Sequence, residues 1–230
     1  MKPEHIFDQA RKENRKNLTE LESREILKHY RIPVVDGLVV QQIEDALAFA
    51  DKRGYPLVLK VVSKDIIHKT DAGGVIIGVK NEKELRDGLI ELIKNIKKNK
   101  PEARIDGIFV QKMLPKAAEV IVGGKKDPTF GQVLLFGLGG VFVEVFNDVS
   151  FRVVPINEKD AVNMISEIKG VKVLRGARGQ KPVDFKALVD ILIRTSRMLE
   201  ENDDIVELDI NPVFALTEGA VAVDARIIID

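Results

Sequence analysis

Short runs of apolar, mostly β-branched residues alternate along the whole chain with longer amphipathic segments. The short runs have the length of single strands, and the longer segments repeat apolar residues every three to four positions, as surface helices do. A chain with this alternation has to pack helices against sheets, which excludes a helical bundle and a β-sandwich. The sequence therefore predicts a mixed α/β (α+β) fold.

Capping residues place the helices. Thr19 and Glu22 form a T-x-x-E capping box, so a helix begins there and has to end before Pro33. Gly54 ends the next helical segment, and Asn81 opens another with an N-x-x-E pattern. The expected helices cover residues 19–31, 43–54, 81–99, 157–169 and 184–201.

β-branched content and length place the strands. Segment 141–155 is compatible with a short helix and with a strand, and the basic, glycine-rich segment 175–182 separates the last two helices. The expected strands cover residues 56–62, 74–80, 107–113, 118–124, 133–140, 205–214 and 220–229, the last two joined by a turn at 217–219.

Composition excludes several classes of protein. The 36 Lys and Arg residues balance 36 Asp and Glu residues, so net charge gives no case for nucleic acid or an anionic membrane as partner. No apolar run approaches the roughly 20 residues of a membrane-spanning helix, and residues 1–17 are polar, unlike a secretory signal. With no cysteine, disulfides and thiolate chemistry are excluded. We expect a cytoplasmic protein.

A single lysine interrupts the apolar strand 56–62. Period-two alternation places Lys60 on the face opposite to Leu57, Leu59 and Val61. An ammonium group is costly to bury unless an anion meets it, which indicates a phosphate ligand. The alternative is a lysine on an edge strand that extends to water, and the alternation leaves both open.

The last two strands carry acidic residues and an asparagine. Alternation places Glu207, Asp209 and Asn211 on one face of the first strand, and Asp224 interrupts the second. A hairpin between them would bring Asn211 and Asp224 side by side. A few oxygen ligands that leave room for water and phosphates suit Mg²⁺. A hydrogen-bonded sheet edge is the alternative, and the spacing leaves both open.

Other chemical signals are weaker. His68 is the one histidine of three that lies in an expected loop between strands, within "SKDIIHKTDAGGV". The glycine clusters at 136–140 and 175–179 could offer backbone N–H groups to a phosphate, but neither is a Walker A or G-x-G-x-x-G motif. No G-x-S-x-G element supports a Ser-His-Asp triad.

Taken in order, six motifs resemble the ATP-grasp subunits of the nucleoside-diphosphate-forming acyl-CoA synthetases, and above all the separate β subunits of ADP-forming acetyl-CoA synthetases (acetate–CoA ligases). This resemblance implies a two-lobed ATP-grasp fold, with a first lobe at 33–114 and a second lobe at 115–230 on which helix 19–31 packs. The motifs are "ESREILKHYRIPV", "GYPLVLKVVSKDIIHKTDAGGV", "QKMLPKAAEVIVG", "DPTFGQVLLFGLGGVFVEVFNDVSFRVVP", "RGARGQKPVD" and "ELDINPVFA…AVAVDAR".

The resemblance also implies ATP or ADP and Mg²⁺ as ligands. Lys60 matches the lysine that holds nucleotide phosphates, and Glu119 matches an acid that contacts the ribose or the nucleotide. Asn211 and Asp224 match the Mg²⁺ ligands, while Asp209 replaces the Glu of a related "EINP" motif and is expected beside them. Gln111, Met113 and Leu114 match the strand that reads adenine, and Gly139 and Gly140 match a loop that leads to a phosphate-facing helix.

His68 matches the histidine that carries a phosphoryl group in family members whose subunits are split in this way. Neutral imidazole is a competent nucleophile near pH 7, and a phosphoramidate is reactive enough to phosphorylate ADP. By the same resemblance, Lys69 would offset phosphate charge and Asp71 would orient the ring. We expect the glycines at 73–74 to let the loop swing.

The implied reaction is acyl-CoA + ADP + phosphate giving carboxylate + CoA + ATP. The chain resembles only the nucleotide half of such an enzyme, so a separate CoA-binding α subunit is implied, in an α2β2 heterotetramer. One alternative is a self-sufficient ATP-grasp ligase that joins a carboxylate to an amine. Another is a non-catalytic nucleotide-sensing module, which has no physical reason to keep a reactive histidine together with a phosphate lysine and a metal pair.

Overall fold

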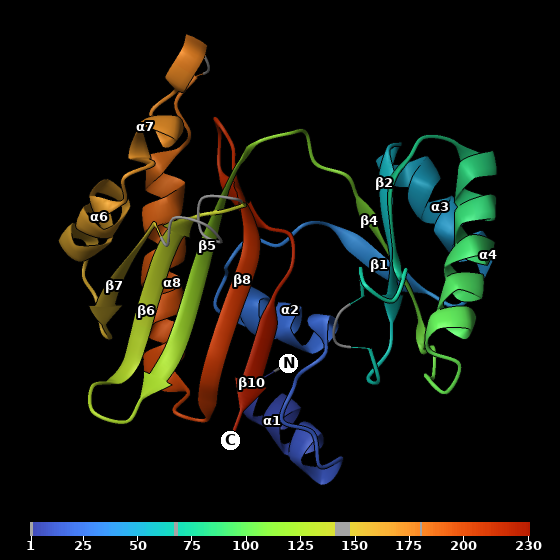
Figure 1. Ribbon diagram of the computed structural model, residues 1–230, viewed down its shortest axis with the longest axis horizontal. Coiled ribbons are helices and arrows are strands. Elements are labelled where there is room, and N and C mark those ends of the chain that lie inside the picture. The colour runs from blue at the N-terminus through green and yellow to red at the C-terminus, as the bar shows by residue number, and fades with distance from the viewer. Residues whose placement is uncertain (1, 67–68, 141–147, 180) are drawn as a thin grey trace. The chain divides into compact units, whose positions relative to one another are not determined.

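The computed structural model describes residues 2–66, 69–140, 148–179 and 181–230. The chain divides into two compact units (Figure 1): unit 1 comprises Met1–Val34 and Lys116–Asp230, and unit 2 comprises Val35–Pro115. Unit 1 is discontinuous, since the N-terminal residues fold with the C-terminal half. Each unit packs helices against an antiparallel sheet, so the mixed α/β fold class is confirmed.

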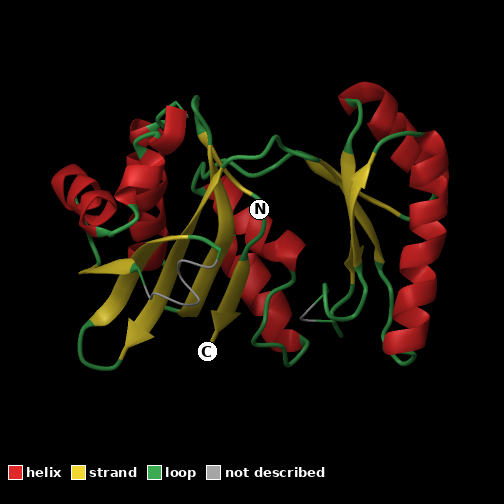
Figure 2. Ribbon diagram, turned by 45° about the horizontal axis from the view of Figure 1, so that its top comes forward, coloured by secondary structure: helices red, strands yellow, loops and turns green. Residues whose placement is uncertain are grey.

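Unit 2 is a four-stranded sheet covered on one face by two helices (Figures 1 and 2). Its strand order is β1-β4-β2-β3, so β4 and β2 are internal and β1 and β3 are edges. Leu57, Leu85 and Leu92 are fully buried between sheet and helices. The elements are β1 (Gly37–Val40), α3 (Ile43–Arg53), β2 (Leu57–Val62), β3 (Val75–Val79), α4 (Glu82–Asn99) and β4 (Gly107–Lys112).

The helix ends of unit 2 follow the capping signals. The side chain of Asn81 accepts the backbone N–H of Glu84 at 2.9 Å and starts α4. Gly54, at a φ of +70°, ends α3 and donates its N–H to the carbonyl of Ala50 at 2.7 Å. A positive φ is open to glycine without the steric penalty that a side chain would bring. Both helices are confirmed.

Unit 1 is a six-stranded sheet with the path β10-β8-β5-β6-β7, and β9 pairs with β8. Helices α6 and α8 cover one face, and α1 and α2 share the same core (Figure 2). The elements are α1 (Pro3–Lys12), α2 (Glu20–His29), β5 (Ala118–Asp127), β6 (Gly131–Leu138), β7 (Val149–Val153), α6 (Glu158–Glu167), α7 (Val171–Leu174), a 3-10 turn (Ala177–Gly179), α8 (Phe185–Glu201), β8 (Ile205–Ala215), β9 (Ala220–Ala222) and β10 (Arg226–Ile229).

The N-terminal segment holds one expected and one unexpected helix. The reciprocal capping box of Thr19 and Glu22 is formed at the start of α2, which is confirmed. Helix α1 is not among the elements expected from the sequence. It buries Ile6, Phe7 and Ala10 in the unit 1 core, and this small apolar group within a polar segment is a weak periodic signal.

Two other segments differ in detail from expectation. Strand β5 runs to Asp127, beyond the expected end at residue 124. In the ambiguous segment 141–155, residues 149–153 form strand β7, and residues 141–147 lie outside the described part of the chain. Of the residues that the structure describes, no helix combines the length and apolar character needed to cross a membrane.

Candidate functional site

Lys60 lies inside the sheet of unit 2. Its strand β2 pairs with β4 on one side and β3 on the other, with Lys60 opposite Phe109 and Val75. The residue is only 6% exposed, and it faces away from the core residues Leu59 and Val61. The edge-strand alternative for Lys60 is therefore wrong, because β2 has no free edge. A buried ammonium at this position calls for an anion.

Gln111 lies on the same face of unit 2 as Lys60. The register of β2 against β4 pairs Val58 with Gln111 and Lys60 with Phe109, so the two polar side chains sit on adjacent strands and one side of the sheet. Gln111 is 2% exposed, and within the described residues its Oε1 atom has no hydrogen-bond partner. A buried amide oxygen of this kind can accept a hydrogen bond from a ligand.

The segment after Gln111 is held to the start of β2. The N–H of Met113 donates to the carbonyl of Pro56 at 3.1 Å, and Lys112 Nζ donates to the carbonyl of Tyr55 at 2.8 Å. Met113 and the following Leu114 are half-buried. The lysine at 112 was not a candidate, although its neighbours were. Its long side chain here fixes the chain next to the expected adenine-reading segment.

His68, the candidate phosphoryl carrier, lies outside the described residues, together with residue 67. The described end of its loop is a tight turn, in which the N–H of Gly74 donates to the carbonyl of Lys69 at 2.7 Å. The N–H of Gly73 bonds to the carbonyl of Thr70 at 3.0 Å. Lys69 is half-buried and Asp71 is exposed.

The glycine pair closes this loop against the sheet. A Cβ atom at Gly74 would lie 2.5 Å from Cγ1 of Val61, and Gly73 has a φ of +69°. The carbonyl of Gly74 also accepts the N–H of Val61 at 2.8 Å. Both glycines are therefore held at the C-terminal end of the loop, and the expectation that the loop swings stays a prediction.

Glu119 and the glycine loop meet in unit 1. The N–H of Gly139 donates to the carbonyl of Glu119 at 2.7 Å, and a Cβ at Gly139 would lie 3.0 Å from the Cβ of Glu119. Gly139 is buried, whereas Glu119 is exposed. Gly140 follows at a φ of +65°, and no atom of the described residues lies within 4 Å of the position that a Cβ would take. The residues after Gly140, up to 147, lie outside the described part of the chain.

Asn211 and Asp224 stand side by side in the last hairpin, as expected. The N–H of Asn211 donates to the carbonyl of Asp224 at 3.2 Å, and the N–H of Val223 donates to the carbonyl of Pro212 at 2.9 Å. Strand β8 reverses its buried face here, since Ile210 and Val213, three positions apart, are both fully buried. The interruption of β8 at Asn211–Pro212 lies opposite the interruption between β9 and β10 at Val223–Asp224. The strands therefore stay paired on either side of it.

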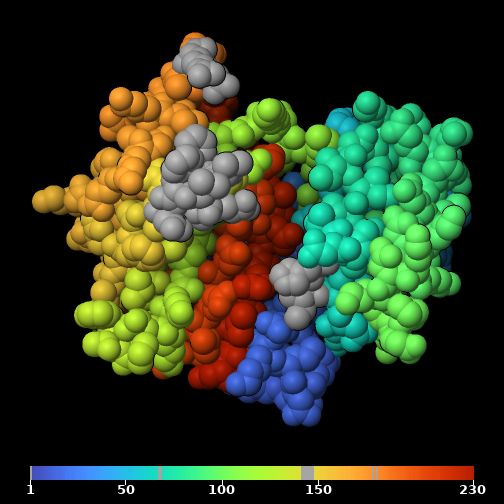
Figure 3. Space-filling view, viewed as in Figure 1, coloured from blue at the N-terminus to red at the C-terminus, as the bar shows by residue number. Residues whose placement is uncertain are grey.

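Glu207 and Asp209 lie on the face of the unit 1 sheet that is turned away from α8, because they alternate with the core residues of β8. Atoms of β8 and β10 (red) reach the surface in Figure 3. Burial raises the pKa of Asp209 above its usual value; the guanidinium of Arg226 opposes that rise, and the carboxylates of Glu207 and Asp224 add to it. Arg226 lies opposite Asp209 in the register and also bonds the carboxylate of Glu207.

Arg226 was not among the sequence candidates. The signal that could have found it is the expected hairpin, which places a cation across from Asp209. Among the described residues no group of three or more His, Cys, Asp or Glu side chains is arranged to hold a metal ion. A metal at Asn211 and Asp224 would therefore take few protein ligands. Mg²⁺ commonly keeps several waters and binds substrate phosphates.

The described candidates thus fall into two sets. In unit 2 the structure places Lys60 and Gln111 on one sheet face, with Met113 and Leu114 at the end of β4. In unit 1 it brings Asn211 and Asp224 together, with Asp209 beside them. Glu119, Gly139 and Gly140 form a second group in unit 1. A buried cation such as Lys60 can bind a phosphate, and a pair of oxygen donors such as Asn211 and Asp224 can bind a metal ion.

The ATP-grasp domain family matches residues 9–229 of the chain. The β subunit of acetate–CoA ligase [ADP-forming] I from Pyrococcus furiosus is 48% identical over 99% of this chain and 98% of its own length. The acetate–CoA ligase [ADP-forming] I of Archaeoglobus fulgidus is a longer chain; it is 42% identical over 89% of this chain, which spans 30% of that relative.

Solved structures of the dinucleotide-forming acetyl-coenzyme A synthetase 1 of Ca. Korarchaeum cryptofilum are also similar. The complex with coenzyme A, Ca-AMPCP and HgCl⁺ matches with a TM-score of 0.95 and 45% identity, over 100% of both chains. A complex with coenzyme A and Mg-AMPPCP, whose phosphohistidine segment points towards the nucleotide binding site, matches with a TM-score of 0.87, 42% identity and 100% coverage of both chains. The chain belongs to the ATP-grasp family, among the β subunits of ADP-forming acyl-CoA synthetases.

Proposed function

We propose that this chain is the nucleotide-binding subunit of an ADP-forming acyl-CoA synthetase, which converts acyl-CoA, ADP and phosphate into a carboxylate, CoA and ATP. The observation that carries the proposal is the likeness to a separate β subunit over 98% of that subunit's length, at 48% identity. A buried lysine and a paired Asn–Asp hairpin at the expected positions support it.

The residues present fit a nucleotide. The unpartnered Oε1 of Gln111 can accept a hydrogen bond from the exocyclic amine of adenine, and the buried ammonium of Lys60 can hold phosphate oxygens. We assign base contacts to Gln111, Met113 and Leu114, and a nucleotide contact to Glu119. The N–H groups of Gly139 and Gly140 are assigned to the loop that leads to the phosphates.

The residues of the last hairpin fit Mg²⁺, because an amide oxygen of Asn211 and a carboxylate of Asp224 are hard oxygen donors on paired backbone. When bound, Mg²⁺ would neutralise charge on the transferring phosphate. Asp209 supports these ligands from the neighbouring position on β8, and Arg226 across the hairpin balances its charge.

His68 is assigned the phosphoryl transfer itself. Its imidazole attacks the phosphorus of a phosphoryl group held by the partner subunit, so that a P–N bond forms on His68 while the bond from that phosphorus to the partner's carrier atom breaks and the carrier atom keeps the electron pair. ADP then attacks this phosphorus, the P–N bond breaks and neutral imidazole is regenerated. Lys69 offsets the charge of the phosphohistidine and Asp71 orients the ring. The anchored glycines at 73–74 leave the preceding residues to move.

The longer relative of which this chain spans 30% implies that a CoA-binding partner supplies the remaining parts of the enzyme. An α2β2 heterotetramer in the cytoplasm is part of the proposal. Within it, units 2 and 1 serve as the first and second ATP-grasp lobes.

Phosphoryl labelling of the assembled enzyme tests the proposal. The complex of this chain with its CoA-binding subunit is incubated with γ-labelled ATP, and we expect an alkali-stable, acid-labile label on this chain. The variant His68→Asn, whose side chain is similar in size but cannot carry phosphate, should lose the label and ATP synthesis while ADP binding stays unchanged. Normal ATP synthesis by His68→Asn would contradict the assignment.

The same preparations separate the alternatives. A self-sufficient carboxylate–amine ligase would form product from the purified chain alone with an amine acceptor. A nucleotide-sensing module would bind ADP but would give neither label nor ATP in the complex. We expect the chain alone to bind ADP and to make no product.

A further inference from the structure

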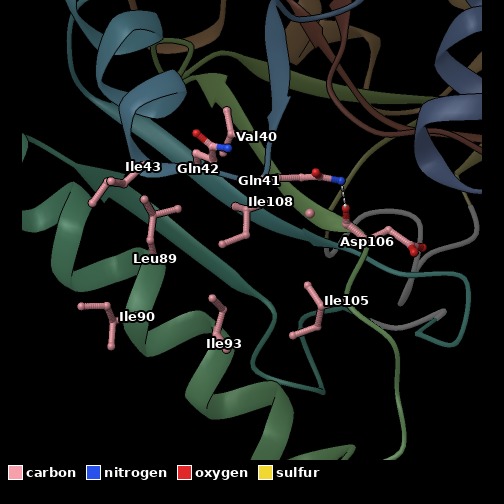
Figure 4. A pocket seen from close by; sticks show the side chains of 11 residues that line it. Val40, Gln41, Gln42, Ile43, Leu89, Ile90, Ile93, Ile105, Asp106 and Ile108 are labelled. Atoms are coloured by element: carbon pink, nitrogen blue, oxygen red, sulfur yellow. Dashed lines mark hydrogen bonds between the residues drawn. The ribbon is translucent and has the colours of Figure 1, made fainter.

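Unit 2 has an apolar groove on the outside of α4, with a volume of about 420 Å³ (Figure 4). One wall comes from α4, and the other comes from the β1–α3 connection and the start of β4. Two of its side chains are exposed, Ile90 at 67% and Ile93 at 36%. The groove is lined mainly by aliphatic side chains, among them Val40, Ile43, Leu89, Ile90, Ile93 and Ile108.

Cationic side chains border this groove. Lys94 and Lys97 follow Ile90 and Ile93 by one helical turn, so they lie on the same side of α4. Within the part of the chain that the structure describes, neither lysine forms an ion pair, whereas Arg86 and Lys83 on the preceding turns pair with carboxylates of α4. An apolar centre with a charged rim is the usual composition of a protein interface. The lining also holds Asp106, which pairs with Arg104 at 3.3 Å, so Lys94 and Lys97 are charges beside the groove that no ion pair offsets within the described residues, and they favour an acidic partner.

One wall of the groove is tied to the start of the loop that carries His68. Asp106, which lines the groove, donates its N–H to the carbonyl of Val62 at 2.8 Å, and its own carbonyl accepts Nε2 of Gln41 at 3.2 Å (Figure 4). The N–H of Arg104 donates to the carboxylate of Asp65 at 2.8 Å. A molecule in the groove would therefore sit beside the residues from which that loop departs.

We propose that this groove docks the CoA-binding partner subunit, through an apolar segment flanked by acidic side chains; this inference rests on the proposed function. Three observations select that occupant. The rim is cationic, the wall is bonded to the root of the His68 loop that the partner has to reach, and a longer relative holds covalently what this chain has to hold by contact. A partner docked there delivers phosphate where the loop begins.

The test compares two isoleucines of unit 2 with nearly equal exposure. Ile90 is 67% exposed in the groove, and Ile77 is 68% exposed on β3, away from it. Ile90→Glu should weaken association with the partner subunit by about tenfold or more, since a buried carboxylate would replace an apolar anchor. Ile77→Glu should leave association unchanged. Both variants should keep the wild-type thermal unfolding temperature and ADP affinity, measured by calorimetry.

Charge reversal gives a second readout. The double variant Lys94→Glu/Lys97→Glu should slow association and reverse its dependence on salt, as expected for a cationic rim that meets an acidic partner. Equal association rates at low and high salt for this variant and for wild type would overturn the charge assignment.

The outcomes separate this inference from the proposed function. If Ile90→Glu associates with the partner subunit as the wild type does, the proposal that the groove docks this subunit is wrong. The proposal is also wrong if only Ile77→Glu loses association, since the interface would then lie at the edge of β3. Self-association of the wild-type chain that Ile90→Glu abolishes overturns it in favour of a second copy. If the wild-type chain fails to bind ADP, the proposed function fails, whatever the association measurements give.

Discussion

Lys60 shows how a position within a sheet decides what a charged side chain can do. On an edge strand the same lysine would extend to water at little cost. On β2, between β3 and β4, it is 6% exposed and its ammonium is largely removed from water. A desolvated cation interacts more strongly with phosphate oxygens than a hydrated one does.

Replacement of Lys60 by Met should weaken nucleotide binding without unfolding the protein. Methionine keeps the aliphatic stem and removes the charge, so we expect the loss of about 2 kcal/mol in ADP binding, roughly thirtyfold in Kd. The variant should remain folded, because methionine fills nearly the same volume in the sheet. Titration calorimetry with ADP measures the first, and urea unfolding the second. Lys80→Met, at an exposed position of unit 2, should change neither; an unchanged Kd for Lys60→Met would contradict the phosphate role.

Asp184 holds two parts of unit 1 together through one carboxylate. Its Oδ1 accepts the N–H of Ala187 at 3.0 Å and caps α8, and its Oδ2 accepts the N–H of Gly219 at 2.9 Å in the last hairpin turn. Hydrogen bonds from Gly219 and then Ala187 hold the pKa of this carboxyl below its usual value. The ionised carboxylate of Asp184 therefore stabilises the folded protein at pH values above its unfolded-state pKa of about 3.9. This contribution to the free energy of unfolding is lost as pH falls through the lower folded-state pKa.

Asp184→Ala should therefore destabilise the protein by about 1 kcal/mol near neutral pH. The difference in the free energy of unfolding between Asp184→Ala and wild type should become smaller as the pH is lowered below about 4, because the wild-type carboxyl then becomes protonated. Urea unfolding of both proteins at neutral and acidic pH measures this. Asp184→Asn, which retains a capping oxygen, should recover part of the loss at neutral pH. A difference that does not depend on pH would contradict the ionised cap.

At the scale of elements, the loop at 63–74 is fixed at its C-terminal end by contacts of backbone and side chains. Gly74 has no room for a side chain beside Val61, and the side-chain amide of Asn99 on α4 donates to the carbonyl of Ala72 at 3.1 Å. The end of the loop is thus bonded to both a strand and a helix of unit 2.

Gly74→Ala should disturb this anchor. The added Cβ would lie 2.5 Å from Cγ1 of Val61, so the sheet or the loop has to shift, at a cost of about 1–3 kcal/mol. Gly123→Ala is the matched control, because its Cβ would have ordinary contacts, the nearest at 3.4 Å. The free energy of unfolding, from urea titration, should fall for the first variant and change little for the second. Equal values for the two variants would show that the anchor yields freely.

Elements whose ends are encoded locally could be predicted from the sequence. The capping box of Thr19 and Glu22 and the cap at Asn81 act within four residues, and both helices begin where these signals lie. Helix α1 has no side-chain cap and few apolar residues, so its stability comes from packing in the core of unit 1. The neighbours of β2, which decide the environment of Lys60, are set by non-local pairing that alternation does not encode.

At the scale of the whole molecule, the chain builds two separate hydrophobic cores, one in each unit. Residues 1–34 join the core of unit 1 across the intervening sequence of unit 2. Periodicity could predict the helices and strands of both units but not this grouping, which only the family resemblance implied for the N-terminal helix. The grouping depends on which apolar faces meet, and the apolar faces of different helices are chemically alike.

Leucine truncations in the two cores should have local effects. Leu92→Ala in unit 2 and Leu199→Ala in unit 1 each remove a fully buried side chain, and each should cost about 2–5 kcal/mol. Hydrogen exchange of the native protein should speed up mainly in α4 and β2 for the first variant, and in α8 and β5 for the second. If exchange increased equally throughout both units for either variant, the units would unfold as one.

The paired irregularities of the last hairpin restrict how this chain can vary over evolution. Asn211–Pro212 on β8 meets Val223–Asp224 on the returning chain, and the turn at 217–219 sets that alignment. One inserted residue in the turn would slide the strands past each other and separate the two oxygen donors. On the proposed magnesium assignment, related chains that bind the metal here should tolerate substitutions in this turn but no change in its length, and a lengthened turn would indicate that the metal site has been lost.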